Sequence, residues 1–323
     1  MRLLLTLFTF TLLCAAQSNE PLRLEKTIPL PDVQGRIDHM SIDVKNHRLF
    51  MAALGNNTVE VIDTEEGKRI HTIPGLHEPQ GVLYLPEANR LYIANGGDGT
   101  LRIFDGSSYE LIKSIKLGED ADNVRFDATK KQVYVGYGTG ALAVMNEDGT
   151  KVAEINLDAH PESFQLEKNG PRLFVNLPKS RKVAVVDRTK GSVVATWSTG
   201  AAFSNYPMAL DEHDQRLFIV CRLPARLLVL DTNTGKIIQK LPVIGDSDDV
   251  FYDSARKRIY ATGGEGGISV YQQDDTDHYR ETAKLPTAKG ARTSFFSSDL
   301  RQLFVAVRRQ GAEPASIRVY SAQ

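Results

Sequence analysis

Short apolar segments alternate with polar turns along most of the chain. Residues 81–115 show the repeating unit: an apolar segment, a polar turn, the triplet Arg90-Leu91-Tyr92, a Gly-containing turn, and two further segments of alternating polarity. Apolar residues at every second position predict β-strands, and the 3.6-residue spacing of an amphipathic helix does not occur. The pattern therefore predicts an all-β protein made of short strands joined by turns.

A triplet of a basic or amide residue, an aliphatic residue and an aromatic residue recurs seven times. The triplets are Arg48-Leu49-Phe50, Arg90-Leu91-Tyr92, Gln132-Val133-Tyr134, Arg172-Leu173-Phe174, Arg216-Leu217-Phe218, Arg258-Ile259-Tyr260 and Gln302-Leu303-Phe304. Successive aromatic residues lie 40 to 44 residues apart. Four strands in roughly 40–45 residues are typical of one propeller blade, whereas β-solenoid repeats are usually shorter and need caps. We expect one domain, residues 17–323, folded as a seven-bladed β-propeller with four-stranded antiparallel blades.

The two ends of the chain predict how the ring closes. The seventh repeat, 292–323, contains only three strands, the last of them at 316–320. Residues 22–30 form a strand-like segment before the first full repeat. We expect this N-terminal strand to complete the last blade, because a paired strand covers edges that an open blade would expose.

Several repeats resemble a known family. The resemblance is carried by Asn89-Arg90-Leu91-Tyr92-Ile93-Ala94-Asn95, by Gly99-Thr100-Leu101-Arg102-Ile103-Phe104-Asp105, and by Asn57-Thr58-Val59-Glu60-Val61-Ile62-Asp63-Thr64. These segments resemble the YVTN-type repeat, and the chain resembles YncE-like bacterial propellers, which are WD40-like in architecture. The resemblance weakens in repeats six and seven, where Gln272 and Ser321 stand at the position of Asp63. It implies a fold and leaves the function open, because related propellers include lactonases, dehydrogenase subunits and haem-carrying domains.

The first sixteen residues have the pattern of a signal peptide. Met1-Arg2 is a short basic start, residues 3–14 are apolar residues and threonines, and Ala15-Ala16 allows cleavage before Gln17. The run is shorter than the roughly 20 apolar residues of a membrane-spanning helix. We expect a secreted or periplasmic protein without a transmembrane segment. A lipoprotein anchored at Cys14 is the alternative.

Composition narrows the choice of partner. The chain carries 39 Lys and Arg against 40 Asp and Glu, so its net charge of −1 gives no reason to expect nucleic acid as a partner. Two cysteines exclude a disulfide framework, and the absence of a Cys-x-x-Cys-His motif excludes covalently attached haem. We expect a monomer whose partner is a small molecule or an envelope protein.

The repeat also predicts where a site lies, because the loop before each innermost strand opens onto the central channel. Counting back from each aromatic residue gives one mouth position per blade, and the following positions add three residues. The predicted set is Asp38, His39, Gln80, Asp122, Asn123, Glu162, Tyr206, Asp248, Asp249 and Arg292. These residues differ between blades yet stay polar, as expected for one asymmetric ligand-binding pocket. The alternative is structural: the carboxylates accept backbone N–H bonds where the strands begin.

Two functions fit this set of residues. The leading hypothesis is a binding or scaffold propeller that presents its carboxylate-rich channel mouth to a small ligand or a protein. The alternative is a metal-assisted hydrolase such as a lactonase. Oxygen atoms of Asp122, Asn123, Glu162 and Asp248 would suit Ca²⁺ or Mg²⁺, and such an ion could polarise a lactone carbonyl. Basic residues in the loops after the aromatic strands, among them Arg222, are interpreted as a solvated rim.

Overall fold

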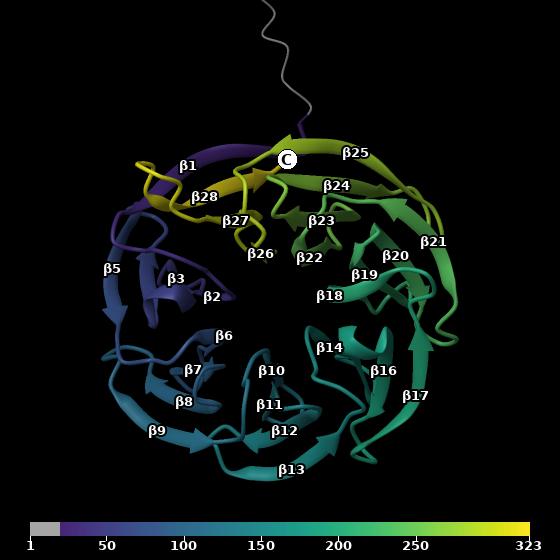
Figure 1. Cartoon of the computed structure of the whole chain (residues 1–323), viewed down its shortest axis with the longest axis horizontal. Helices are drawn as coiled ribbons and strands as arrows, with labels where there is room; N and C mark the ends of the chain where they lie inside the picture. Colours follow the sequence, from purple (N-terminus) through teal and green to yellow (C-terminus); the bar gives the residue numbers. More distant parts are fainter. Residues whose placement is uncertain (1–19) are drawn as a thin grey trace, which may run out of the picture.

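The computed structural model describes residues 20–323, so the predicted signal peptide at 1–16 lies outside the described residues. Seven four-stranded antiparallel sheets form a ring around a central opening (Figure 1). The helical elements of residues 20–323 are two short 3₁₀ turns, η1 (Leu54–Asn56) and η2 (Pro178–Ser180). No helix in this range has the length and apolar character needed to cross a membrane. The predicted seven-bladed β-propeller is confirmed.

Each blade contributes one strand to each of four concentric positions. The innermost strands are β2 (Met40–Asp43), β6 (Pro79–Leu85), β10 (Val124–Asp127), β14 (Phe164–Leu166), β18 (Phe203–Asp211), β22 (Ser247–Asp253) and β26 (Ser294–Ser297). The second strands are β3 (Arg48–Ala53), β7 (Arg90–Asn95), β11 (Gln132–Tyr137), β15 (Arg172–Leu177), β19 (Arg216–Leu223), β23 (Arg258–Gly263) and β27 (Gln302–Val307). The third strands are β4 (Thr58–Asp63), β8 (Thr100–Asp105), β12 (Ala141–Asn146), β16 (Lys182–Asp187), β20 (Ala225–Asp231), β24 (Gly267–Gln273) and β28 (Ala315–Ala322). The outermost strands are β5 (Lys68–Ile73), β9 (Leu111–Lys116), β13 (Lys151–Asn156), β17 (Ser192–Ser198), β21 (Ile237–Pro242), β25 (Tyr279–Pro286) and β1 (Leu22–Leu30).

The ring closes as the sequence predicts. Strand β1 pairs with β28 along its whole length, from Leu22 opposite Ala322 to Leu30 opposite Ala315. The first and last parts of the described chain therefore share the seventh blade (Figure 1). This pairing covers the outer edge of β28, which would otherwise be an unpaired strand edge open to association.

The apolar core lies between the blades. Seven clusters of buried side chains each join two neighbouring sheets. The aromatic residue of every triplet is on a second strand and is at most 1% exposed. The Phe50 ring, for example, lies 5.2 Å from the ring of Tyr84 on the next blade, measured between centroids. Because apolar contact holds the blades together at their faces, the loops at the channel are free to carry polar side chains.

Cys221 belongs to this core rather than to a site. It is completely buried on β19, and burial raises the pKa of its thiol to about 12. A thiol that stays protonated at neutral pH is a poor nucleophile. The residue therefore acts as a small apolar side chain between the fourth and fifth blades.

Candidate functional site at the channel mouth

The second strands anchor the mouth residues through the backbone. The Asp122 N–H donates to the carbonyl of Gly136 at 2.9 Å, and the Gly136 N–H donates to the carbonyl of Asn123 at 3.0 Å. Equivalent bonds join Asp38 to the carbonyl of Ala52 and Glu162 to that of Asn176. The mouth carboxylates on three blades are thus fixed to the most deeply packed strands of the fold, so their side chains have defined positions.

Three other blades reach the mouth through β-bulges. The pairing of innermost and second strands shifts between Pro79 and Val82, between Asn205 and Met208, and between Ser247 and Asp249. The mouth residues Gln80, Tyr206 and Asp248 lie inside these three irregularities. A bulge turns a side chain away from the regular alternation of a strand, which explains how strand residues come to face the opening.

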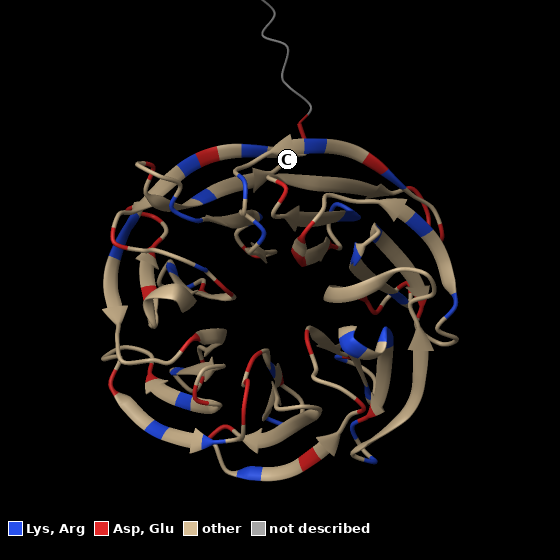
Figure 2. Cartoon of the chain, viewed as in Figure 1, with Lys and Arg blue, Asp and Glu red and all other residues tan. Residues whose placement is uncertain are grey.

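Residues from all seven blades line one cavity of about 290 Å³ at the mouth. Figure 2 shows acidic segments at the inner ends of several blades around the opening. Nine of the ten predicted site residues line the cavity: Asp38, His39, Gln80, Asp122, Asn123, Glu162, Tyr206, Asp248 and Arg292. The tenth predicted residue, Asp249, does not line the cavity but lies behind the lining residue His39. Its carboxylate accepts the Ser294 N–H at 2.8 Å and lies 3.8 Å from Nδ1 of His39.

Five lining residues fall outside the predicted set: Arg36, Asp120, His160, Ser163 and Arg222. Arg36, Asp120 and His160 each stand two positions before the mouth residue of their blade, so the spacing of the repeat places them next to the predicted set. Arg222 follows the aromatic triplet of the fifth repeat and lies in the cavity wall, so the interpretation as a solvated rim is wrong for this residue. Ser163 carries no signal in the sequence that separates it from other loop serines.

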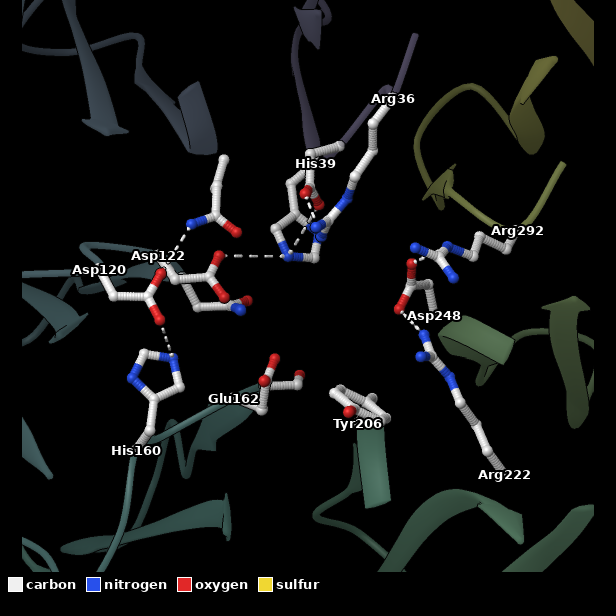
Figure 3. Close-up of a pocket in the computed structure, with 14 residues that line it drawn as sticks. Arg36, His39, Asp120, Asp122, His160, Glu162, Tyr206, Arg222, Asp248 and Arg292 are labelled. Atoms are coloured by element: carbon white, nitrogen blue, oxygen red, sulfur yellow. Dashed lines mark hydrogen bonds and ion pairs between the residues drawn. The ribbon is translucent and has the colours of Figure 1, made fainter. Parts of the chain in front are cut away.

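One side of the cavity, on the first, third and fourth blades, is rich in carboxylates (Figure 3). Nε2 of His39 lies 3.7 Å from Asp38 and 3.8 Å from Asp122. Nε2 of His160 lies 3.7 Å from Asp120, and Gln80 donates to the same aspartate at 3.0 Å. Arg36 also donates to Asp38 at 2.7 Å. The histidine contacts are longer than a hydrogen bond, so the carboxylates of Asp120 and Asp122 keep acceptor capacity toward the cavity.

The opposite side, on the last three blades, is a closed ion-pair network. Asp248 lies between Nη2 of Arg222 and Nε of Arg292, the latter at 2.6 Å. Asp246 contacts the same two guanidiniums, at 3.5 Å and 2.9 Å respectively. The Arg222 guanidinium also stacks on Tyr206, 3.9 Å from the ring centroid (Figure 3). Two arginines and two aspartates balance each other here within the protein.

Burial and crowding oppose ionisation of the mouth carboxyl groups. Burial, followed by the nearby Asp38 and Asp120, raises the pKa of Asp122 to about 7 although His39 acts in the opposite direction. Burial and then Asp122 raise the pKa of Glu162 well above its usual range. Carboxylates in the turns outside the mouth behave in the opposite way. The Ser108 and Ser107 N–H groups, for example, lower the pKa of Asp105. Carboxyl groups whose pKa is strongly raised by burial and by neighbouring acids in a cavity are typical of functional sites.

The sequence leaves open that the mouth carboxylates only accept backbone N–H bonds where the strands begin, and this explanation holds for one of them. Among the mouth carboxylates of residues 20–323, Asp249 is the one that accepts a backbone N–H bond. The side chains of Asp122 and Glu162 do not terminate strands in this way. Their placement is therefore better explained by what the cavity holds than by the needs of the backbone.

The four candidate metal ligands do not fit a divalent ion in this arrangement. Asp248 is bound by two guanidiniums, on the opposite side of the cavity from Asp122 (Figure 3). Within the described chain, no group of three or more His, Cys, Asp or Glu side chains is placed to hold a metal ion.

Comparison with known proteins supports the architecture. No family profile matches the chain, and no curated protein matches it either. Among solved structures, the chain is similar to one chain of the "Crystal Structure of Mitotic Checkpoint Complex", with a TM-score of 0.79 and 12% sequence identity over 99% of this chain and 98% of that chain. At this identity the likeness shows the fold alone. The chain is thus similar to seven-bladed, WD40-like β-propellers, and its YVTN-type, YncE-like resemblance stays a prediction.

Proposed function

We propose that this protein is a binding propeller of the cell envelope whose channel mouth holds a small polar molecule. The observation that carries the proposal is the convergence of all seven blades on one cavity lined by charged and amide side chains. Its volume of about 290 Å³ is at the lower end of the range for small-molecule pockets, roughly 300–1,000 Å³. A polar lining selects a polar ligand, because apolar groups would leave the buried lining atoms without partners.

A small ligand fits this site better than a protein surface does. The lining residues Asp38, Asp122 and His160 are at most 6% exposed, so a flat partner surface would not reach them. The envelope location rests on the signal-peptide pattern at 1–16. We do not propose the hydrolase, because Asp248 is bound by two arginines and the metal that the reaction would need has no ligand set among the described residues.

The test is a binding screen on the mature chain. Small amines, polyols and carboxylates are tested by thermal shift and then by calorimetry, and we expect one class to raise Tm by mass action. Glu162→Gln should weaken that binding about tenfold or more, because a charge-assisted contact is lost. Glu110→Gln, at an exposed loop position, is the matched control and should leave binding unchanged. Binding that survives Glu162→Gln and Asp122→Asn would contradict a ligand site at the mouth.

A further inference from the structure

The two sides of the cavity differ in how their charges are compensated. On the last three blades, Arg222 and Arg292 contact both Asp246 and Asp248, so these charges cancel. On the third and fourth blades, the contacts of Asp120 and Asp122 with histidines are 3.7 Å and 3.8 Å long. Glu162 has no ion-pair partner among the described residues. The surplus of negative charge is therefore on the third and fourth blades.

Unpaired acceptors lie on the same side. Oδ1 of Asp122 and Oδ1 of Asn123 are buried and have no hydrogen-bond partner within residues 20–323. The two residues are 5% and 1% exposed, and both line the cavity. In Figure 3 the Asp122 carboxylate points into the space between His39 and Glu162. A buried acceptor without a donor destabilises the protein, so this arrangement indicates a ligand that supplies donors.

From this geometry we propose that the ligand is a small organic cation whose primary ammonium group lies between Asp122, Asn123 and Glu162. The inference rests on the proposed function, since it names the chemistry that the same cavity binds. An ammonium group has three N–H donors, no acceptor and a positive charge, which matches two unpaired oxygens and an uncompensated carboxylate. On the far side, Nε of Arg292 is buried and makes no hydrogen bond within residues 20–323, so it is a donor available to a hydroxyl or carbonyl group on the rest of the ligand.

Protonation gives the proposal a second, independent readout. A bound cation favours the ionised form of a carboxyl group, so it lowers a pKa that burial and neighbouring acids have raised. Asp122 faces His39, Asp38, Asp120 and Arg36. Glu162 faces Asp122, Asp248, Asp38 and Asp120, and no cation is among its largest influences. Binding should therefore release protons, and affinity should rise between about pH 5.5 and about pH 8, below the pKa of the amine.

The experiment compares amines with neutral molecules of the same shape. Calorimetry on the mature chain uses 1,4-diaminobutane against 1,4-butanediol and glucosamine against glucose, with acetate and calcium chloride as further probes. We expect an amine to bind about tenfold or more tightly than its neutral partner. Titrations in buffers of different ionisation enthalpy should show proton release. Nα-acetyl-lysine methylamide tests whether a lysine side chain of a protein is the natural source of the ammonium group.

Variants locate the ammonium group. Asp122→Asn and Glu162→Gln should each reduce amine affinity about tenfold or more and reduce proton release. Glu110→Gln should do neither. If one of the two site variants does not fold, the other carries the test, because each removes one carboxylate from the same ammonium position.

Several results would overturn the inference while leaving a binding propeller intact. Preference for glucose or butanediol over the amines would show a neutral ligand, and preference for acetate an anionic one. Calcium binding that displaces the amines and is lost in Glu162→Gln would show a metal site. Amine binding that survives both site variants would place the ammonium elsewhere. If no probe of any class binds, both the inference and the proposed function fail.

Discussion

At the scale of single residues, two aspartates show opposite relations to the fold. Asp43, on β2, is 2% exposed and contacts Nη2 of Arg48 at 2.6 Å. Burial opposes its ionisation, but hydrogen bonds from Asn46 and Arg48 outweigh burial and lower its pKa. Asp122 is equally well buried, yet neighbouring acids reinforce burial and its pKa rises to about 7. The ionised form of Asp43 therefore stabilises the folded protein, whereas the ionised form of Asp122 destabilises it.

This difference predicts that Asp122→Asn stabilises the protein at neutral pH. The folded-state pKa of Asp122 is above its ordinary value of 3.8, so the unfolded chain loses the proton first. The contribution of Asp122 to the free energy of unfolding should therefore fall as pH rises from about 4 to about 7, and the amide, which cannot ionise, should remove this fall. We expect a gain of about 1–3 kcal/mol in the free energy of unfolding near pH 8. Urea unfolding of the wild type and the variant at about pH 5 and about pH 8 measures this gain. A gain that is the same at both pH values would contradict the raised pKa of Asp122.

The matched substitution Asp43→Asn should have the opposite effect. Because the folded-state pKa of Asp43 is lowered, its contribution is present above the ordinary value of 3.8 and is lost as pH falls through the folded-state pKa. Removing the carboxylate also takes away the anionic partner of Arg48, whose guanidinium keeps the Gly106 carbonyl and the Tyr109 hydroxyl as acceptors. We expect a loss of about 1–3 kcal/mol at neutral pH, measured by the same urea titrations. A stability equal to that of the wild type would show that these two acceptors are enough to hold Arg48.

The sequence predicts most of the site because the repeat fixes the positions of the mouth residues. Counting from the aromatic triplets finds nine lining residues, since each blade enters its innermost strand at nearly the same spacing. Contacts between blades do not follow from this spacing. That His39 lies within 4 Å of Asp122 and Asp249, which belong to other blades, depends on how the sheets face one another across the channel. Neither the charge state of Asp122 nor the stacking of Arg222 on Tyr206 can be read from the chain.

At the scale of elements, the second strands have two tasks. They carry the aromatic residue that packs between blades, and their carbonyl groups anchor mouth residues such as Asp122. The strands themselves follow from the two-residue alternation. The bulges at Gln80, Tyr206 and Asp248 do not, because an extra residue in a strand leaves no mark in a pattern of apolar and polar positions.

Substitutions of Tyr92 should change the stability of the protein and leave its ligand affinity unchanged. Its side chain is completely buried on β7, and its hydroxyl donates to the carbonyl of Glu147 at 2.5 Å. Tyr92→Ala should cost about 3–5 kcal/mol by leaving a cavity between the second and third blades. Tyr92→Phe, which loses only the hydrogen bond, should cost about 0.5–1.5 kcal/mol. Chemical denaturation measures both, and the folded variants should keep the ligand affinity of the wild type. A near-neutral Tyr92→Ala would show that the blades do not depend on this contact.

At the scale of the whole molecule, the strand that closes the ring also joins two blades of the site. β1 pairs with β28 inside the seventh blade, and Ile28 and Leu30 of β1 are completely buried in the cluster between the seventh and first blades. The same two blades supply Arg36 and Arg292 to the cavity wall. Seven blades and the closing strand follow from counting repeats, whereas the cavity that closure creates depends on the three-dimensional ring.

Removing the closing strand should therefore remove binding as well as stability. A chain that begins at residue 31 lacks β1, so the outer edge of β28 is unpaired and two clusters lose Leu22, Ile28 and Leu30. Each lost aliphatic side chain is worth about 2–5 kcal/mol, so Tm should fall by more than about 10 °C and the exposed edge should promote association. Melting curves and size-exclusion chromatography measure these effects, with a chain that begins at Glu20 as the control. Because the missing element is a single edge strand, a synthetic peptide of residues 20–30 should pair with β28 and restore Tm, ligand binding and the elution volume of the control chain. A truncated protein with the elution volume and Tm of the control chain would show that β1 does not lock the ring.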